Sequence, residues 1–286
     1  MTGGRLSISQ LNHKAMTIRR DIISMLEEAG SGHSAGPLGM TDMLTALYFD
    51  IMKVDPKNPE WSERDMFFLS NGHTAPVLYA TMAEAGFFEK SELKTLRKFG
   101  SRLQGHPERT KLPGLESTSG PLGEGLSQAA GYAYVLQYLD KNPHRQVYVM
   151  TGDGELNEGN IWEGAMFAGK YKLGQLTVFV DRNNIQIDGN TEDVMPLEDL
   201  RGKWESFGWH VQDIDGNNMQ SIIDAAGMTR AITNRPSVII AHTIPGKGVD
   251  FMEYDYRWHG MPPNHEQAKE ALKKLRTLDG KIEAGE

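Results

Sequence analysis

Three carboxylates and three glycines are crowded at the end of a short apolar stretch, in the segment VYVMTGDGELNEGN. The carboxylates are Asp153, Glu155 and Glu158, and the glycines are Gly152, Gly154 and Gly159. Like charges this close repel one another, so we expect a cation to bind nearby. In a chain with a formal net charge of -8, a metal ion is a ready source of positive charge for a phosphate-bearing ligand.

The side chain of Asn183 completes the sharpest motif. Asp153 offers a carboxylate oxygen after one apolar stretch, and Asn183 offers an amide oxygen after the next one. A strand–helix–strand crossover brings two such strand ends side by side. Together with a backbone carbonyl and phosphate oxygens, these atoms suit Mg²⁺ or Ca²⁺, and the glycines let the backbone approach a diphosphate. The alternative is that Gly-Asp-Gly and Asn-Asn are ordinary turn dipeptides.

Four of the nine histidines lie in loops of small residues. They are His33, His73, His106 and His259. We predict that they share a site, since histidines donate hydrogen bonds to polyhydroxylated or phosphorylated substrates and titrate near neutrality. The alternative for each is a loop residue held by backbone groups. The remaining histidines are expected to be structural or exposed, namely His13, His144, His210, His242 and His265.

The segment STSGPLGEGLSQAAGYA forms the third candidate. Gly120, Pro121, Leu122 and Gly123 make a rigid turn that leads into a helix, and such a turn can hold a planar ring against backbone groups. The helix behind it is rich in Ala and Gly, which permits close approach of another helix across an interface. An ordinary turn followed by a buried helix would give the same pattern.

Alternating helices and strands are predicted to position these residues. Apolar stretches predict strands at 66–70, 146–150, 176–181, 209–214 and 237–243. Periodic stretches predict helices at 8–29, 40–52, 74–86, 123–139, 158–172, 197–207, 217–233 and 265–276, with long loops at 29–39 and 98–122. This order predicts an α/β fold, a doubly wound parallel sheet flanked by helices. Ligands of such sheets bind beyond the carboxyl ends of the strands, where the polar motifs fall.

Composition narrows the function classes. The chain has 286 residues, of which 39% are hydrophobic and 24% charged, and it has no cysteine for a disulfide or a thiolate metal site. Its acidity argues against nucleic-acid binding. No apolar run approaches the roughly 20 residues that span a bilayer, and MTGGRLSISQ lacks the apolar stretch of a secretory signal. We expect a cytoplasmic protein with no membrane or nucleic-acid partner.

Seven motifs in order resemble those of transketolase, an enzyme that uses thiamine diphosphate. They are SGHSAGPLGM, LSNGH, GHPE, TSGPLGEGL, GDGELNEG, DRNNIQIDG and WHG, and the resemblance runs from about residue 8 to residue 270. It implies the thiamine-diphosphate-binding fold, with thiamine diphosphate and Mg²⁺, or Ca²⁺ or Mn²⁺, as cofactors. Its implied reaction moves a two-carbon ketol unit from a ketose phosphate to an aldose phosphate.

The resemblance also implies a role for individual residues. The metal ligands would be Asp153, Asn183 and the backbone carbonyl of Ile185; the cofactor contacts would be His73, Gly120, Pro121, Leu122, Gly152, Gly154 and Asn183. His33, His106 and His259 match histidines that contact the donor sugar and assist proton transfers. Glu158 matches a glutamate at the subunit interface that links two active sites.

The chain departs from the family pattern because it matches only the first of three domains. We expect residues 1–286 to form a single diphosphate-binding domain with natural termini at Met1 and Gly285–Glu286. The pyrimidine-binding domain, with the glutamate that protonates the aminopyrimidine ring, and the C-terminal domain would then lie on a partner chain. A lysine often found after the last strand aligns with either Pro245 or Lys247.

These features predict the N-terminal subunit of a split transketolase, assembled with two copies of each chain and acting on sugar phosphates. Two alternatives stay open. One is a related half-enzyme for 1-deoxyxylulose-5-phosphate synthesis or for ketol transfer from an unusual sugar. The other is a non-catalytic binding or regulatory protein, against which the intact Asp153, Asn183 and histidines argue.

Overall fold

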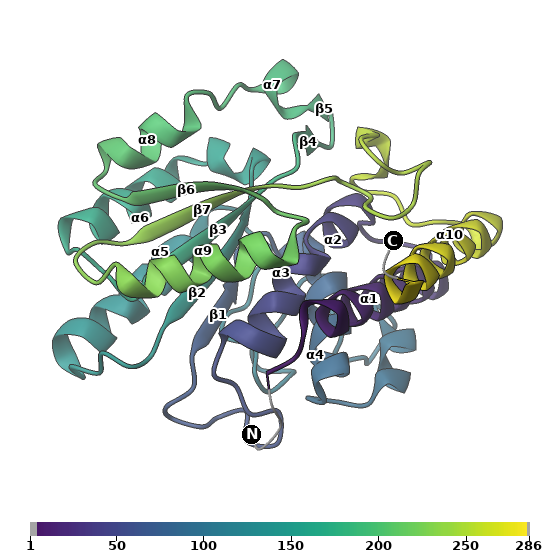
Figure 1. Cartoon of the computed structure of the whole chain (residues 1–286), viewed down its shortest axis with the longest axis horizontal. Coiled ribbons are helices and arrows are strands. Elements are labelled where there is room, and N and C mark those ends of the chain that lie inside the picture. The colour runs from purple at the N-terminus through teal and green to yellow at the C-terminus, as the bar shows by residue number, and fades with distance from the viewer. Residues whose placement is uncertain (1–4, 285–286) are drawn as a thin grey trace.

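A five-stranded parallel sheet forms the centre of the computed structural model, which describes residues 5–284 (Figure 1). The predicted termini at Met1 and Gly285–Glu286 lie outside the described residues. The strand order is β1-β2-β3-β7-β6, and every neighbouring pair is parallel. The strands are β1 (Met66–Leu69), β2 (Val147–Gly152), β3 (Leu176–Arg182), β6 (His210–Asp215) and β7 (Ser237–His242).

The central strands are buried on both faces, as expected for a covered parallel sheet. Every residue of β2 and β3 is buried. Because successive side chains point to opposite faces, Phe179 joins one hydrophobic cluster while Val178 and Val180 join the other. The edge strand β6 is more accessible, and Val211 is the one buried residue among the six that form it. The centre of the sheet therefore lies between two separate hydrophobic cores.

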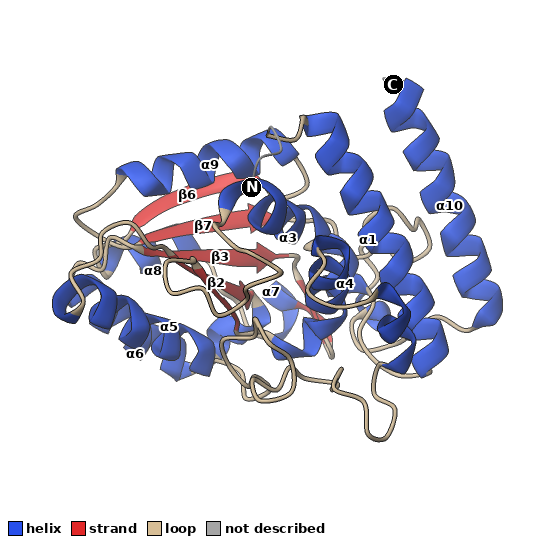
Figure 2. Ribbon diagram, turned by 90° about the horizontal axis from the view of Figure 1, so that it is seen from below, coloured by secondary structure: helices blue, strands red, loops and turns tan. Residues whose placement is uncertain are grey.

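Two layers of helices cover the sheet. The first core holds α1 (Ile8–Ala29), α3 (Thr41–Ala46), α4 (Ala75–Ala85), α9 (Met219–Ala231) and α10 (His265–Ala284), and the second holds α5 (Glu124–Tyr134), α6 (Gly159–Lys170) and α8 (Leu200–Ser206). Figure 2 shows α9 above the sheet and α5 and α6 below it. The predicted doubly wound α/β fold is confirmed.

Residues at both ends of α1 cap the helix. Ser7 accepts a hydrogen bond from the backbone of Gln10, whose side chain accepts one from Ser7, and Gly30 ends the helix with a left-handed φ of 61°. The buried Arg19 forms two hydrogen bonds with Asp42, of 3.0 and 2.7 Å, which joins α1 to α3. The loop that follows Gly30 is thus fixed at both flanks.

The structure differs from the predicted elements in short or irregular segments. A helix, α2 (Ala35–Gly39), lies within the predicted loop 29–39, and the predicted helices 40–52 and 123–139 each finish in a π turn. Strands β4 (Ile185–Gln186) and β5 (Gly189–Asn190) and helix α7 (Thr191–Val194) were not predicted, because such short elements give no periodic signal. The 3₁₀ turns are Gly72–Thr74, Lys90–Thr95, Gly154–Asn157 and Tyr256–Trp258, and the π turns are Leu47–Ile51 and Val135–Leu139.

The last helix is longer than predicted: α10 continues past residue 276 to Ala284. Within residues 5–284, none of the helices combines the length and the apolar character needed to cross a membrane.

Candidate functional site

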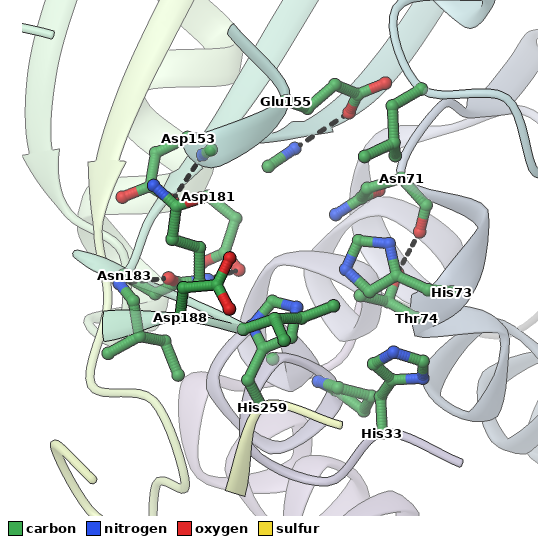
Figure 3. Close-up of a pocket in the computed structure, with 18 residues that line it drawn as sticks. His33, Asn71, His73, Thr74, Asp153, Glu155, Asp181, Asn183, Asp188 and His259 are labelled. Atoms are coloured by element: carbon green, nitrogen blue, oxygen red, sulfur yellow. Dashed lines mark hydrogen bonds between the residues drawn. The ribbon is translucent and has the colours of Figure 1, made fainter. Parts of the chain in front are cut away.

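A cavity of about 190 Å³ lies beyond the carboxyl ends of β1, β2 and β3 (Figure 3). The end of β1 contributes Asn71 and His73, and the loop after β2 contributes Asp153 and Glu155. The other lining residues include Gly152, Gly154, Asp181, Asn183, Ile185 and Gln186 from β2, β3 and the segments that follow them, and His33 and His259 from distant loops. The strand ends singled out in the sequence therefore meet at one cavity.

Asp153 and Asn183 are brought together by the pairing of β2 with β3. Gly152 is in register with Asp181, and the backbone N–H of Asp153 donates to the carbonyl of Asp181 over 3.2 Å. Both Asp153 and Asn183 line the cavity. Their proximity was therefore predicted correctly from the strand–helix–strand crossover.

The Asp153 carboxylate is buried and oriented by several donors. Its Oδ1 accepts from the Gly154 N–H at 2.8 Å, and its Oδ2 accepts from the Asn184 N–H at 2.7 Å and from Arg182 Nη1 at 3.0 Å. Burial raises the pKa of Asp153, while Arg182 and the hydrogen bonds oppose that rise. Oδ1 accepts only one of these bonds and keeps a lone pair for a further ligand.

Arg182 is a site residue that was not identified from the sequence. It is buried and links Asp153 to Glu192 and to Glu198, the latter at 3.0 Å. Arg182 is the last residue of β3 and follows Asp181, so two adjacent charges at the end of an apolar strand were the available signal. Its contacts fix the segment around α7 beside the Asp153 loop.

The Asn183 side chain is held in a single orientation. Its Nδ2 donates to Asp181 Oδ2 at 2.7 Å, and its Oδ1 accepts from the Ile185 N–H at 3.0 Å. That oxygen therefore retains one lone pair. Asp181 is fully buried, and burial raises its pKa to about 7.

Three histidine rings converge on the cavity. The ring centroids of His33 and His73 are 4.9 Å apart, those of His73 and His259 are 5.3 Å apart, and those of His33 and His259 are 5.6 Å apart. Burial lowers the pKa of each of them, that of His33 to about 4, so the rings are neutral at pH 7. A neutral imidazole offers one hydrogen-bond donor and one acceptor.

His106 is close to this group but does not line the cavity. Its side chain is exposed, and an ideal Cβ built on Gly120 would lie 3.7 Å from its ring. Partial desolvation of the ring and, less strongly, the positive charge of Arg97 lower the pKa of His106. None of the histidines that were expected to be structural or exposed lines the cavity.

Several buried polar atoms around the cavity have no hydrogen-bond partner among the described residues. They are His33 Nδ1, Asn71 Oδ1, Gln186 Nε2 and His259 Nδ1, all on residues that line the cavity. Buried polar groups in proteins are normally hydrogen-bonded, so the cavity fits a polar ligand that supplies these partners. Asn71 and Gln186 were not predicted, although Asn71 follows a strand directly.

The turn before α5 lies beside the cavity. Leu122 lines it, whereas Gly120 and Pro121 do not. Gly123 has a left-handed φ of 86°, and a Cβ there would lie 2.9 Å from the Cβ of Glu158. Glu158 itself is exposed at the start of α6 and does not line the cavity.

The donor set suits a hard divalent cation that shares its ligands with a phosphate. Carboxylate and amide oxygens are available from Asp153 and Asn183, and Ile185 lines the same cavity. No group of three or more His, Asp or Glu side chains suited to a metal occurs in the part of the chain that the structure describes. A cation bound here would therefore need further oxygens from its ligand.

Comparison with known proteins gives one consistent family. The family described as "Transketolase, thiamine diphosphate binding domain" matches residues 11–280. A 6-deoxy-6-sulfo-D-fructose transketolase subunit from a Clostridium species is 43% identical over 93% of this chain and 96% of its own length. An apulose-4-phosphate transketolase subunit from Phocaeicola vulgatus is 39% identical over 97% of this chain and 98% of its own length.

Solved structures agree with these matches. The transketolase from Campylobacter jejuni superposes with a TM-score of 0.88 at 32% identity, over 96% of this chain. The chain covers 43% of that protein, so it spans less than half the length of the solved enzyme.

Proposed function

This chain belongs to the transketolase family and carries its thiamine-diphosphate-binding domain, and we propose that it supplies the diphosphate half of an active site completed by a second chain. The resemblance read from the sequence motifs is confirmed at the level of the family. The relatives named as transketolase subunits are matched over nearly their whole length, which supports the split-enzyme interpretation. The pyrimidine-binding and C-terminal domains are proposed to lie on the partner.

The proposed reaction moves a two-carbon ketol unit from a ketose phosphate to an aldose phosphate. Thiamine diphosphate supplies the carbanion chemistry when it is bound. The unpaired buried atoms of Asn71, His33, His259 and Gln186 are the observation that carries this proposal, because they line a cavity at the strand ends and lack partners within residues 5–284.

Asp153, Asn183 and the Ile185 carbonyl are proposed to hold Mg²⁺, or Ca²⁺ or Mn²⁺, beside the diphosphate. The cavity is rich in carboxylates, with Asp153, Glu155 and Asp181 among its lining residues. A divalent cation offsets that negative charge and lets a phosphate approach. Gly152 and Gly154 flank Asp153 at the end of β2, and their lack of side chains lets the diphosphate approach the backbone. His73 is proposed as a further diphosphate contact.

The neutral histidines are proposed to act on the sugar. His33 and His259 each carry a buried Nδ1 without a partner in the described chain, and their lowered pKa values keep both rings able to accept as well as donate a proton at pH 7. His106, at the rim, is proposed to contact the donor sugar farther from the diphosphate. Glu158 is proposed to face a neighbouring subunit, in keeping with its exposure.

The partner is proposed to cover α5 and α6, the two helices that follow the turn 120–123. Leu139, which ends the π turn after α5, is 67% exposed, and Met166 on α6 is 57% exposed. Because α5 and α6 pack against each other, these exposed apolar side chains support an association surface on this helical layer. Two copies of each chain form the simplest closed assembly with two complete sites.

The sugar substrate is proposed to be a phosphorylated ketose or a related anionic one. The two split relatives are named for 6-deoxy-6-sulfo-D-fructose and for apulose-4-phosphate. Those names support the proposal that the donor is a less common ketose.

Ketol transfer by the chain together with its partner tests this function, with His33→Ala and His259→Ala as the informative variants. Each variant is expected to lower turnover at least about tenfold, which is roughly 1.4 kcal/mol in the activation free energy. Their affinity for thiamine diphosphate, measured by calorimetry, should change by no more than about twofold. His144→Ala, on an exposed loop, serves as the control. Turnover that stays within about twofold in both variants would remove these histidines from the chemistry.

A further inference from the structure

Glu155 is a buried carboxylate without a cationic partner. Its side chain lies among the lining residues of the cavity, yet the residue is only 2% exposed. Within residues 5–284 no Lys or Arg forms an ion pair with it, and the charged group that acts on its pKa is another acid, Glu158. Burying a carboxylate is costly unless hydrogen bonds compensate for the lost water, so its donors are informative.

The donors to Glu155 come from three separate segments. Ser70 Oγ, just after β1, donates to Oε1 at 2.5 Å, and the Gly123 N–H donates to the same oxygen at 2.8 Å. The Gly152 N–H, at the end of β2, donates to Oε2 at 3.1 Å. Ser70 Oγ in turn accepts from the Gly125 N–H at 3.1 Å. All three neighbours of the carboxylate are donors, so it serves as an acceptor at both oxygens.

These contacts join the two parts of the proposed cofactor site. Gly152 precedes Asp153 at the diphosphate end, whereas Gly123 closes the turn 120–123. The start of α5 packs tightly against Ser70, since a Cβ on Gly125 would lie 2.5 Å from the Cβ of Ser70. The turn is therefore tied to the strand end by one side chain and a short hydrogen-bond network.

We infer that Glu155 is a positioning residue that fixes the turn 120–123 relative to the diphosphate loop, so that the ring of thiamine diphosphate meets a preformed surface. This inference rests on the proposed function and on the expectation from the sequence that the turn 120–123 holds the ring of the cofactor. A turn that is already fixed raises the affinity for the cofactor, because less conformational entropy is lost when the cofactor binds. A residue that only stabilised the fold would affect all ligands of the site alike.

The variant Glu155→Gln tests the inference with little change in size. The amide presents an N–H group where the carboxylate presented an oxygen, so in either orientation it faces at least one of the three donors. The full-length chain is titrated by calorimetry, in Mg²⁺, with thiamine diphosphate and separately with inorganic diphosphate. We expect about tenfold weaker binding of thiamine diphosphate, or about 1.4 kcal/mol, and a change of less than about twofold for diphosphate.

Glu124→Gln is the matched control, because Glu124 is an exposed acid next to Gly123. It is expected to bind both ligands like the unaltered chain. Ser70→Ala removes the hydroxyl donor and repeats the test should circular dichroism show that Glu155→Gln is poorly folded.

The outcomes separate this inference from the proposed function. Equal losses for the two ligands, or no loss for either, would overturn the positioning role of Glu155 while leaving the cofactor site in place. Failure of the unaltered chain to bind both thiamine diphosphate and inorganic diphosphate in Mg²⁺ would instead overturn the proposed site and the inference together.

Discussion

Replacement of Asp153 by alanine is expected to abolish the Mg²⁺-dependent binding of thiamine diphosphate while the chain remains folded. Asp153 is the proposed metal ligand with a full negative charge, and Asn183 and a backbone carbonyl cannot replace that charge. Changes to groups around metal ligands already cost 10–100-fold in affinity, so we expect a loss of at least about 100-fold when the ligand itself is removed.

The fold should survive because Asp153 lies just after the last residue of β2 and not within a strand. Arg182 would keep Glu192 and Glu198 as partners, so its buried charge is not left alone. A modest fall in melting temperature is still expected, since the Asn184 N–H and Arg182 Nη1 each lose an acceptor.

Calorimetric titration with and without Mg²⁺ measures the effect, and circular dichroism monitors the fold. Asp193→Ala is the control, because Asp193 is an exposed acid on α7 that bonds only to Asn190 among the described residues. Binding by Asp153→Ala with unaltered affinity in Mg²⁺ would show that the metal site lies elsewhere.

The sheet and its functional edge were predictable because both follow from simple regularities. Central parallel strands must be apolar on both faces, which makes β2 and β3 visible as continuous runs. Parallel strands end at the same edge, so the residues after them must meet. Asp153 and Asn183 could therefore be placed together without any knowledge of the family.

Other parts of the site depend on contacts that the sequence order hides. Glu155 meets Ser70 and Gly123, and Arg182 meets Glu198, through tertiary packing that has no local pattern. The same is true of His33 and His259, whose loops are far apart in the chain. The sequence indicated that these histidines lie in suitable loops, but the fold decides which rings touch.

The identity of the cofactor came from motif resemblance and not from physical reasoning on spacing. Hard oxygen donors with glycines between them indicate a metal and a phosphate, and many ligands contain both. The hairpin of β4 and β5, which contributes Ile185 and Gln186 to the cavity, gave no periodic signal because each strand has only two residues.

The purified chain, saturated with thiamine diphosphate and Mg²⁺, is expected to show no ketol transfer, and addition of the partner should restore it. The family resemblance assigns the glutamate that activates the cofactor to the pyrimidine-binding domain. Glu158 is no substitute, since it is exposed at the start of α6 and does not line the cavity. Glu155 is committed to three donors that hold the site together.

Association should depend on the exposed apolar residues near α5 and α6. We expect the double variant Leu139→Glu, Met166→Glu to weaken partner binding at least about tenfold, because charges placed in an apolar interface must be desolvated. Its own affinity for inorganic diphosphate should be unaltered. Met228→Glu on α9 is the control, since Met228 is 52% exposed on the opposite helical layer.

A coupled assay of ketol transfer, with sedimentation to measure assembly, tests whether activity requires association with the partner. Activity that rises with partner concentration and falls in the double variant would tie catalysis to a composite site. The separation of roles would then have a physical basis: this chain would bind the anionic end of the cofactor with a cation and backbone groups, and the partner would supply the acid at the other end. Robust ketol transfer by the chain alone, free of any partner by mass spectrometry, would contradict the split-subunit proposal, because the described cavity would then have to contain every group the reaction needs.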